Sequence, residues 1–374
     1  MHKYLTFILL LLFCYACAEN QSATTTNSNA YAQNFSIEKT TEGTVLVVKN
    51  PWPNSTLQYR YLLLSPNTQA PQDSSSYTQI IRKPLSRIVV TATPQVTALD
   101  LLGQVEAIVG FPQPQFVSNT RFRNSLEQNK IAAIGNNQQL DVERILQLKP
   151  DVFFGFGVSD NHNALEQLKK AGIPVVWIAD WTERHPLGRA EWIRFFAPFF
   201  QKENLADSLF KTIASEYNSL QKQLDTLKTR PTVMAGAIYQ DVWYLPGGAS
   251  YLGQLFKDAK ADYLWKDTEI TGSISSSAEQ VLLKAQNAAY WFAPAQYTSY
   301  SQLKDDGSLY QRFEAFAHQK IYTYNKSLGS TGGTLFFETG PYQPHLLLKD
   351  IVYWIHPGVI DAYTPYYFKP LDDE

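Results

Sequence analysis

This sequence has little net charge, only two cysteines and no long apolar run beyond its N-terminus. The low net charge and the lack of long apolar runs each exclude a class of protein. Charged residues make up 18% of the chain and nearly cancel to a net charge of −2, so there is no overall basic field for a nucleic-acid partner. Beyond the N-terminus, no stretch reaches the roughly 18 uninterrupted apolar residues that a membrane-spanning helix needs. We therefore expect neither a general nucleic-acid binder nor an integral membrane protein.

The common catalytic motifs are also missing. The sequence has no G-x-x-x-x-G-K-[ST] phosphate loop, no H-E-x-x-H zinc helix and no G-x-S-x-G nucleophile turn. The nearest approach to the last motif, residues 248–253, places its second glycine one residue late. The six histidines show no i, i+4 pair, so the spacing does not support a structural metal site.

Apolar and aromatic residues are abundant. The chain is 374 residues long and 44% hydrophobic, which is enough for a large core and suggests roughly two domains. The aromatic share is 14%, with 22 Tyr, 21 Phe and 8 Trp. This composition suits surfaces that hold large flat ligands, and an aromatic-rich core is the alternative.

The N-terminus has the pattern of an export signal. A short basic start precedes residues 4–15, an apolar run too short to span a bilayer. The only cysteines, Cys14 and Cys17, have C-x-x-C spacing, but their place within and at the edge of this run does not indicate a thioredoxin-like role. The Ala16-Cys17 junction resembles a bacterial lipoprotein signal, which predicts a signal at 1–17 and a lipid on Cys17. An ordinary cleaved secretory peptide is the alternative.

The rest of the chain divides by pattern into a tether, a β appendage and two α/β lobes. Residues 18–34 are small and polar, as in a flexible tether, and residues 35–85 predict a small antiparallel β appendage. Short apolar strands then alternate with helices in 86–186 and again in 231–374, which is typical of parallel sheets. The predicted strands are 87–92, 107–111, 151–155 and 174–179 in the first lobe and 232–239, 288–293 and 321–324 in the second. Between them, apolar residues at helical spacing within 187–230 predict one long helix that joins the lobes.

Two segments at predicted strand ends carry the candidate ligand contacts. In open α/β sheets, ligands bind beyond the carboxyl ends of the strands. The polar cluster 180–192 follows one strand, and 239–248 follows another. With the loops near 121 and 137, they supply the predicted ligand-binding residues Arg121, Asn137, Trp181, Arg184, Tyr239, Trp243 and Tyr244. An acid/base set of Asp180, Glu183 and His185 is an alternative reading of the first cluster, and helix capping by Asp180 and Glu183 is another.

A weak internal repeat links the two lobes. Residues 141–154 can be laid on residues 277–290, and each begins a short helix with a glutamate, Glu143 or Glu279, before leading into a buried strand. The helix dipole alone favours a glutamate in a first turn, so these two segments need not be related.

Residues of about 81–357 resemble the helical-backbone class of periplasmic binding proteins for ABC importers, the group for ferric siderophores, haem and vitamin B12. The most specific piece is 140–152, Leu-Asp-Val-Glu-Arg-Ile-Leu-Gln-Leu-Lys-Pro-Asp-Val. The resemblance implies two Rossmann-like lobes joined by a backbone helix from about 187 to 227. It also implies that Glu143 and Glu279 dock on arginines of the permease.

On this resemblance we expect a monomeric receptor, lipid-anchored on the periplasmic side of the cell envelope, that works with a permease and its ATPase. Its ligand would be an iron chelate or a corrinoid, and it would have no cofactor of its own. The β appendage departs from the minimal family pattern, and Asn137 stands where a cobalamin-binding member has a tryptophan. An exported α/β enzyme and a surface interaction module remain the alternatives.

Overall fold

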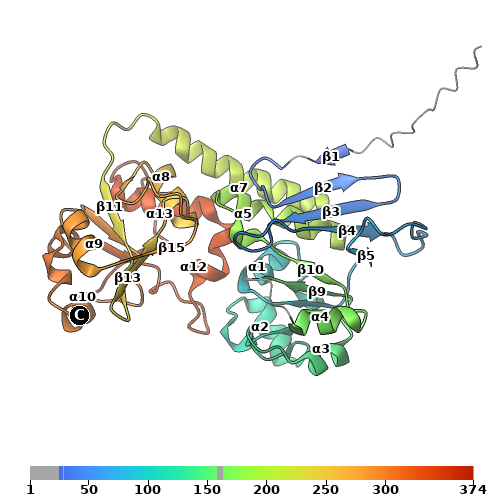
Figure 1. Ribbon diagram of the computed structural model, residues 1–374. Helices are drawn as coiled ribbons and strands as arrows, with labels where there is room; N and C mark the ends of the chain where they lie inside the picture. Colours follow the sequence, from blue (N-terminus) through green and yellow to red (C-terminus); the bar gives the residue numbers. More distant parts are fainter. Residues whose placement is uncertain (1–24, 28, 158–162, 374) are drawn as a thin grey trace, which may run out of the picture.

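The computed structural model describes residues 25–27, 29–157 and 163–373 (Figure 1). The predicted signal at 1–17, with Cys17, lies outside the described residues, as do residues 18–24 and 28 of the predicted tether. In the described part of the chain, no helix is both long enough and apolar enough to cross a membrane.

The N-terminal lobe is built on a five-stranded parallel sheet with the order β10-β9-β6-β7-β8. Strands β6, β7, β9 and β10 are short and fully buried, as expected for a parallel sheet covered by helices, and the edge strand β8 is partly exposed. The strands are β6 (Ile88–Val90), β7 (Ile108–Phe111), β8 (Ala132–Ala133), β9 (Val152–Gly155) and β10 (Val175–Trp177). The helices are α1 (Thr93–Leu101), α2 (Thr120–Glu127), α3 (Val142–Leu148) and α4 (Asn163–Lys170).

The C-terminal lobe has a second five-stranded sheet, with the order β14-β11-β16-β17-β18 and only β18 antiparallel. Its strands are β11 (Thr232–Ala235), β14 (Asp262–Tyr263), β16 (Tyr290–Phe292), β17 (Ile321–Thr323) and β18 (Lys369–Pro370). Its helices are α8 (Tyr251–Asp258), α9 (Ala278–Ala285), α10 (Tyr300–Asp306), α11 (Glu314–Ala317), α12 (Leu335–Glu338) and α13 (Pro344–Ile355).

A single strand was expected over residues 232–239, but the chain breaks at Gly236 and changes sheet. Gly236 has a φ of +80°, and a Cβ there would lie 1.9 Å from the carbonyl oxygen of Tyr244, so only glycine fits. The following residues form a separate antiparallel sheet of β12 (Ala237–Tyr239), β13 (Val242–Pro246) and β15 (Ser273–Ser276).

The helix between the lobes is shorter than expected. The continuous helix predicted from about residue 187 to 227 is divided into α5 (Pro186–Glu191), α6 (Ile193–Phe196) and α7 (Glu203–Leu224). Pro198 and the left-handed Gln201, with φ +57°, separate the last two. At 1.5 Å per residue, the 22 residues of α7 span about 33 Å. Figure 1 shows α7 running along one side of both lobes.

The N-terminal β appendage is part of the protein core. Its strands are β1 (Thr25–Asn27), β2 (Phe35–Lys39), β3 (Thr44–Lys49), β4 (Gln58–Leu64) and β5 (Gln79–Arg82). Strands β2 to β4 pair antiparallel, as predicted for 35–85, whereas β5 pairs parallel to β4. Strand β1 pairs antiparallel with β2, although it lies in the segment predicted as a tether. Trp52 packs edge-on against Trp177 of the N-terminal lobe at 5.4 Å, and the Tyr61 hydroxyl accepts the Trp177 backbone N–H. The appendage therefore shares one hydrophobic core with the lobes.

Two buried carboxylates hold the chain that enters this sheet. Glu191 accepts the backbone N–H groups of Ala30, Tyr31 and Ala32 at 2.8–3.0 Å. Glu183 accepts those of Gln33 and Asn34 at 2.9–3.1 Å. Composition assigns these residues to the tether, but the structure fastens them to the body of the protein.

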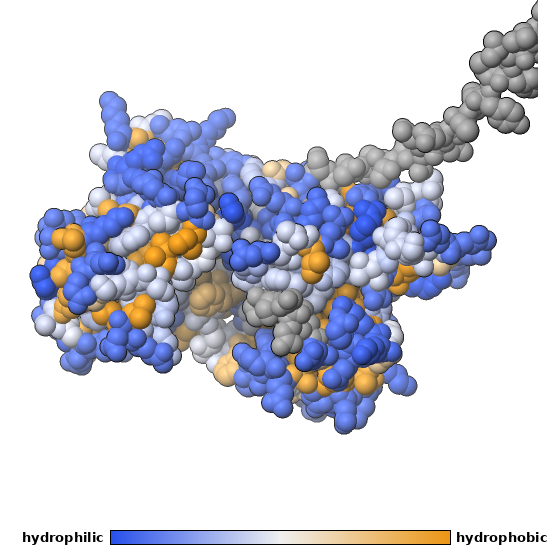
Figure 2. All heavy atoms as spheres, in the orientation of Figure 1, coloured by the Kyte–Doolittle hydropathy of each residue, from blue (hydrophilic) through white to orange (hydrophobic). Residues whose placement is uncertain are grey.

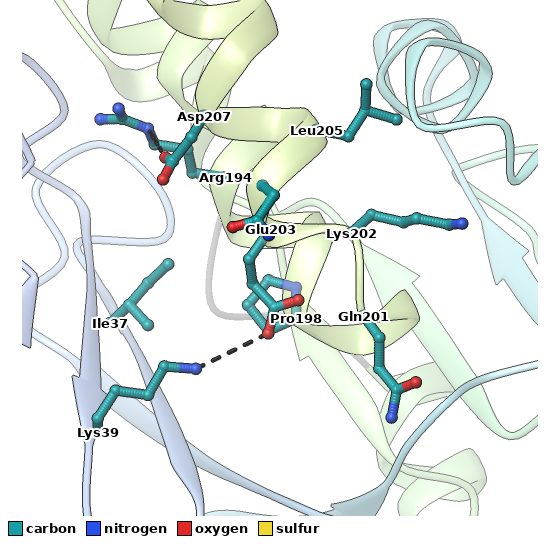
Figure 3. A pocket seen from close by; sticks show the side chains of 10 residues that line it. Ile37, Lys39, Arg194, Pro198, Gln201, Lys202, Glu203, Leu205 and Asp207 are labelled. Atoms are coloured by element: carbon teal, nitrogen blue, oxygen red, sulfur yellow. Dashed lines mark ion pairs between the residues drawn. The ribbon is translucent and has the colours of Figure 1, made fainter.

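A polar hollow of about 570 Å³ lies where the appendage meets the start of α7 (Figure 3). The ammonium of Lys39 lies 3.7 Å from the Glu203 carboxylate, and Arg194 pairs with Asp207 at 2.8 Å. Because these charges already neutralise one another, the hollow is a polar seam between two elements.

Candidate functional site

Two adjoining, mainly apolar chambers of about 400 Å³ and 390 Å³ lie between the lobes. Figure 2 shows a hollow between the lobes, with hydrophobic residues visible inside it. Arg189, Phe337 and Pro341 line both chambers and so form their common boundary. We call them the N-terminal chamber and the C-terminal chamber after the lobe that supplies most of each wall.

Loops at the carboxyl ends of β6, β7, β9 and β10 form the N-terminal chamber. This is the sheet edge at which open α/β folds bind ligands. Its remaining lining residues are Thr91, Ala92, Thr93, Pro94, Phe111, Pro112, Gln113, Phe116, Asn137, Phe156, Asp180 and Trp181. The chamber is therefore mainly apolar, with polar groups at a few points.

The C-terminal chamber is lined by tyrosines and small polar residues from β12, β13 and the start of α8. Tyr239 and Tyr244 are 58% and 42% exposed, although both have large side chains. Tyr251, Tyr324 and Phe336 complete its aromatic wall. Exposed aromatic rings around a hollow can stack on a flat or conjugated ligand.

Arg189 supplies a positive charge at the boundary between the chambers. Its guanidinium donates to the backbone carbonyls of Trp181 at 2.7 Å and Glu183 at 3.3 Å, and it lies 4.2 Å from the centre of the Tyr251 ring. Burial raises the pKa of the Asp180 carboxyl, and the nearby charge of Arg189 opposes that rise. These contacts fix the guanidinium where an anionic group could meet it from either chamber.

Four of the predicted ligand residues lie in the chambers. Asn137 and Trp181 line the N-terminal chamber, and Tyr239 and Tyr244 line the C-terminal chamber. The Asn137 amide also donates to the carbonyl of Thr91 at 3.2 Å, which orients it.

Three other predicted ligand residues lie elsewhere. Trp243 is fully buried, and its indole donates to the carbonyl of Ala235 at 3.1 Å. Successive side chains of a strand point to opposite faces, so the exposure of Tyr244 on β13 places Trp243 in the core. Arg121 is exposed and pairs with Asp100 at 2.9 Å, and Arg184 is exposed and lines neither chamber.

The proposed acid/base set has structural roles. The Glu183 carboxylate accepts hydrogen bonds from the backbone N–H groups of Gln33 and Asn34 and from the Trp192 indole N–H at 3.1 Å. His185 caps α5 by accepting the Leu187 N–H at 3.1 Å, and its ring lies 4.9 Å from that of Tyr31. Burial lowers the pKa of His185. Of the three residues, only Asp180 faces a chamber.

Glu143 and Glu279 are exposed in the first turns of α3 and α9, one on each lobe. Asp141 caps α3 through the N–H of Arg144, and Ser277 caps α9 through the N–H of Gln280. The two segments of the sequence repeat therefore have the same local structure, a capped helix with a solvent-facing glutamate.

The sequence reasoning missed Arg189, Phe116, Phe156 and Phe337. Arg189 belongs to the polar cluster 180–192, and its place one turn into the helix after β10 was a usable signal. Phe337 lies on a helix too short to show a period, so only the tertiary structure brings it to the site.

Comparisons with known proteins agree with this architecture. A model of the family described as "Periplasmic binding protein" matches residues 88–328. The chain is 24% identical over 299 residues to an uncharacterized lipoprotein of Methanocaldococcus jannaschii, covering 78% of this chain and 70% of that protein.

Solved structures with the same fold include a periplasmic haem-binding protein of Vibrio cholerae, with a TM-score of 0.55 and 16% identity over 70% of this chain and 99% of that one. A molybdate periplasmic binding protein of Haemophilus influenzae has a TM-score of 0.52 and 20% identity, covering 76% of this chain and 96% of that one. The predicted two-lobe α/β fold is confirmed.

Proposed function

The chain belongs to the periplasmic binding protein family, and from this premise we propose that it captures an iron chelate (a siderophore or haem) or a cobalamin-type ligand between its lobes. It is the solute-binding component of an ABC transporter and not an enzyme. The alternative of an exported enzyme that acts through Asp180, Glu183 and His185 is therefore wrong.

The observation that carries the proposal is the position of Arg189 between two aromatic chambers. A ferric chelate or a haem combines an apolar or conjugated body with carboxylate or other anionic oxygens. The body would pack on the aromatic walls, and the anionic oxygens would accept hydrogen bonds from the guanidinium. A bare oxyanion such as molybdate would make no use of the apolar walls.

The metal of such a ligand would keep its own donors. Among residues 25–27, 29–157 and 163–373, no group of three or more His, Cys, Asp or Glu is placed to hold a metal ion. We therefore propose that recognition acts on the outer surface of the chelate, and that the chain carries no cofactor of its own.

Delivery would use the two exposed glutamates. Glu143 and Glu279 lie on different lobes, so a permease with an arginine opposite each could grip both lobes at once. A lipid on Cys17 would hold the protein, as a monomer, at the membrane that contains the permease. The permease would in turn connect it to the ATPase. This docking rests on the family pattern at residues 140–152.

A titration of tryptophan fluorescence tests the ligand proposal. The ligands are ferric hydroxamate and catecholate siderophores, ferric citrate, haemin and cyanocobalamin, with correction for their absorbance. We expect one of them to bind saturably at a 1:1 ratio, and Tyr244→Ala to weaken that binding by about tenfold.

Tyr366→Ala is the matched control, because Tyr366 is 44% exposed, close to the 42% of Tyr244, and lines neither chamber. Binding of none of the five ligand types would contradict the proposed ligand class. Equal losses in the two variants would contradict the cleft as its site.

A further inference from the structure

A segment of the C-terminal lobe crosses the cleft and is fastened to the N-terminal lobe. Residues 327–335 form a tight turn in which the Leu335 N–H donates to the Ser327 carbonyl at 2.9 Å. At its tip, the Thr331 hydroxyl donates to the Phe116 carbonyl at 3.0 Å and lies 2.8 Å from the Ser118 hydroxyl. The turn therefore joins the two lobes independently of α7.

The helix that follows this turn makes a second fastening. Glu338, at the end of α12, is buried, and its carboxylate accepts the Ser118 N–H at 2.9 Å. Its backbone carbonyl accepts the Thr97 hydroxyl of α1 at 2.7 Å. Hydrogen bonds to a buried carboxylate are among the stronger ones in proteins, so α12 is held firmly against the N-terminal lobe.

Two glycines allow the turn to lie this close. A Cβ at Gly329 would lie 2.0 Å from the Ser118 hydroxyl oxygen, and a Cβ at Gly333 would lie 2.7 Å from the Phe116 carbonyl oxygen. Side chains at these positions would push the crossing segment off the N-terminal lobe.

The crossing segment places Phe337 between the chambers. The residue precedes the fastened Glu338, is 55% exposed and lines both chambers. Its ring packs edge-on against Tyr324 at 5.4 Å and Phe336 at 5.1 Å. The backbone after Phe337 is hydrogen-bonded to the N-terminal lobe through Glu338, and its ring packs on rings of the C-terminal lobe. Phe337 can therefore leave the boundary only if it breaks one of these two groups of contacts.

We propose that Phe337 is a partition that sets the size of the ligand, so that the protein selects compact anionic chelates over rigid tetrapyrroles. This inference rests on the proposed function and narrows it. Each chamber is about 400 Å³ or 390 Å³, near the lower end of the range of roughly 300–1,000 Å³ for ligand pockets. A compact chelate can occupy one chamber and still reach Arg189. A planar macrocycle cannot bend round the ring that stands between them.

The test compares ferric citrate, as the compact chelate, with haemin, as the rigid tetrapyrrole, by isothermal titration calorimetry. We expect the wild-type protein to bind ferric citrate more tightly than haemin. In Phe337→Ala, and to a smaller extent in Phe337→Leu, the ratio of haemin affinity to ferric citrate affinity should rise by about tenfold or more. Leu328→Ala is the matched control, since Leu328 lies on the same segment, is 51% exposed and lines neither chamber.

An unchanged affinity ratio in Phe337→Ala, or equal changes in Leu328→Ala, would overturn the partition while leaving the proposed function standing. Failure of both proteins to bind either compound would instead remove ferric citrate and haemin from the proposed ligands. In that case the dyes ANS and bis-ANS, which fluoresce in apolar cavities, test the partition without the natural ligand. In Phe337→Ala, the ratio of bis-ANS affinity to ANS affinity should be higher than in the wild-type protein, because bis-ANS is the larger dye. An unchanged affinity ratio would overturn the inference.

Discussion

Replacing Glu191 tests how firmly the N-terminal segment is held. Its carboxylate is fully buried and accepts the N–H groups of Ala30, Tyr31 and Ala32, and it pairs with Arg194 at 2.7 Å. A net contribution of about 1.5–3 kcal/mol for each hydrogen bond to a charged group gives an upper bound of about 9 kcal/mol for the three N–H contacts.

The observed loss should be smaller than this bound. Residues 30–32 can leave the surface and bond to water, and Arg194 keeps Asp207 at 2.8 Å as a second partner. We therefore expect Glu191→Ala to lower the free energy of unfolding by about 3 kcal/mol. Glu191→Gln retains one acceptor oxygen, so it should cost about half as much.

Urea unfolding followed by circular dichroism measures the free energies, and hydrogen exchange measures the protection of the three amides. Glu216→Gln serves as the control, because Glu216 has a half-exposed side chain and should change stability by less than about 0.5 kcal/mol. Glu191→Ala could instead lower the free energy of unfolding by less than about 1 kcal/mol, or leave the exchange rates of residues 30–32 unchanged. Either result would show that the hydrogen bonds from residues 30–32 to Glu191 do not stabilise the fold.

The remaining predictions concern pH, charge and docking. Burial lowers the pKa of His185, so its contribution to stability is full above about pH 6.5 and is lost as the pH falls through its folded-state pKa. His185→Asn keeps an N-cap acceptor and should reduce the loss of unfolding free energy between about pH 7 and pH 5, measured in urea; an equal loss would contradict this. Arg189→Met should weaken ligand binding in calorimetry by at least about tenfold, whereas Arg184→Met, outside both chambers, should leave it unchanged. Glu143→Ala combined with Glu279→Ala should abolish uptake in a transport assay at unchanged ligand affinity, and a loss of affinity would refute the docking role.

Much of the fold could be predicted because its strands are short, apolar and bounded by breakers. The predicted strands 87–92, 107–111 and 151–155 contain β6, β7 and β9. The interlobe helix was predicted too long, because apolar residues continue through 187–202 while the chain there turns at Pro198 and Gln201. Apolar residues at helical spacing show which side of a helix is buried, but they do not show whether the helix is continuous or broken by a turn.

The candidate site could be predicted only in part, because its boundary is assembled from distant segments. Trp181 follows β10 and could be found by that rule. Tyr244 follows the predicted strand 232–239, although the structure places it within β13. Phe116 and Phe337 are brought together through Ser118, Thr331 and Glu338, and no local pattern links these positions.

Aromatic content alone does not mark the ligand surface of this protein. The ring of Trp243 packs at 5.6–5.8 Å against those of Trp291, Tyr310 and Phe313, and all of these are buried. Its neighbour Tyr244 is exposed on the opposite face of the same strand. Because a core ring contributes packing that a cavity would forfeit, changes at Trp243 should act on stability, whereas changes at Tyr244 should act on ligand affinity. Ligand preference can therefore vary through the exposed rings of the chambers, while the buried rings around Trp243 keep the C-terminal lobe folded.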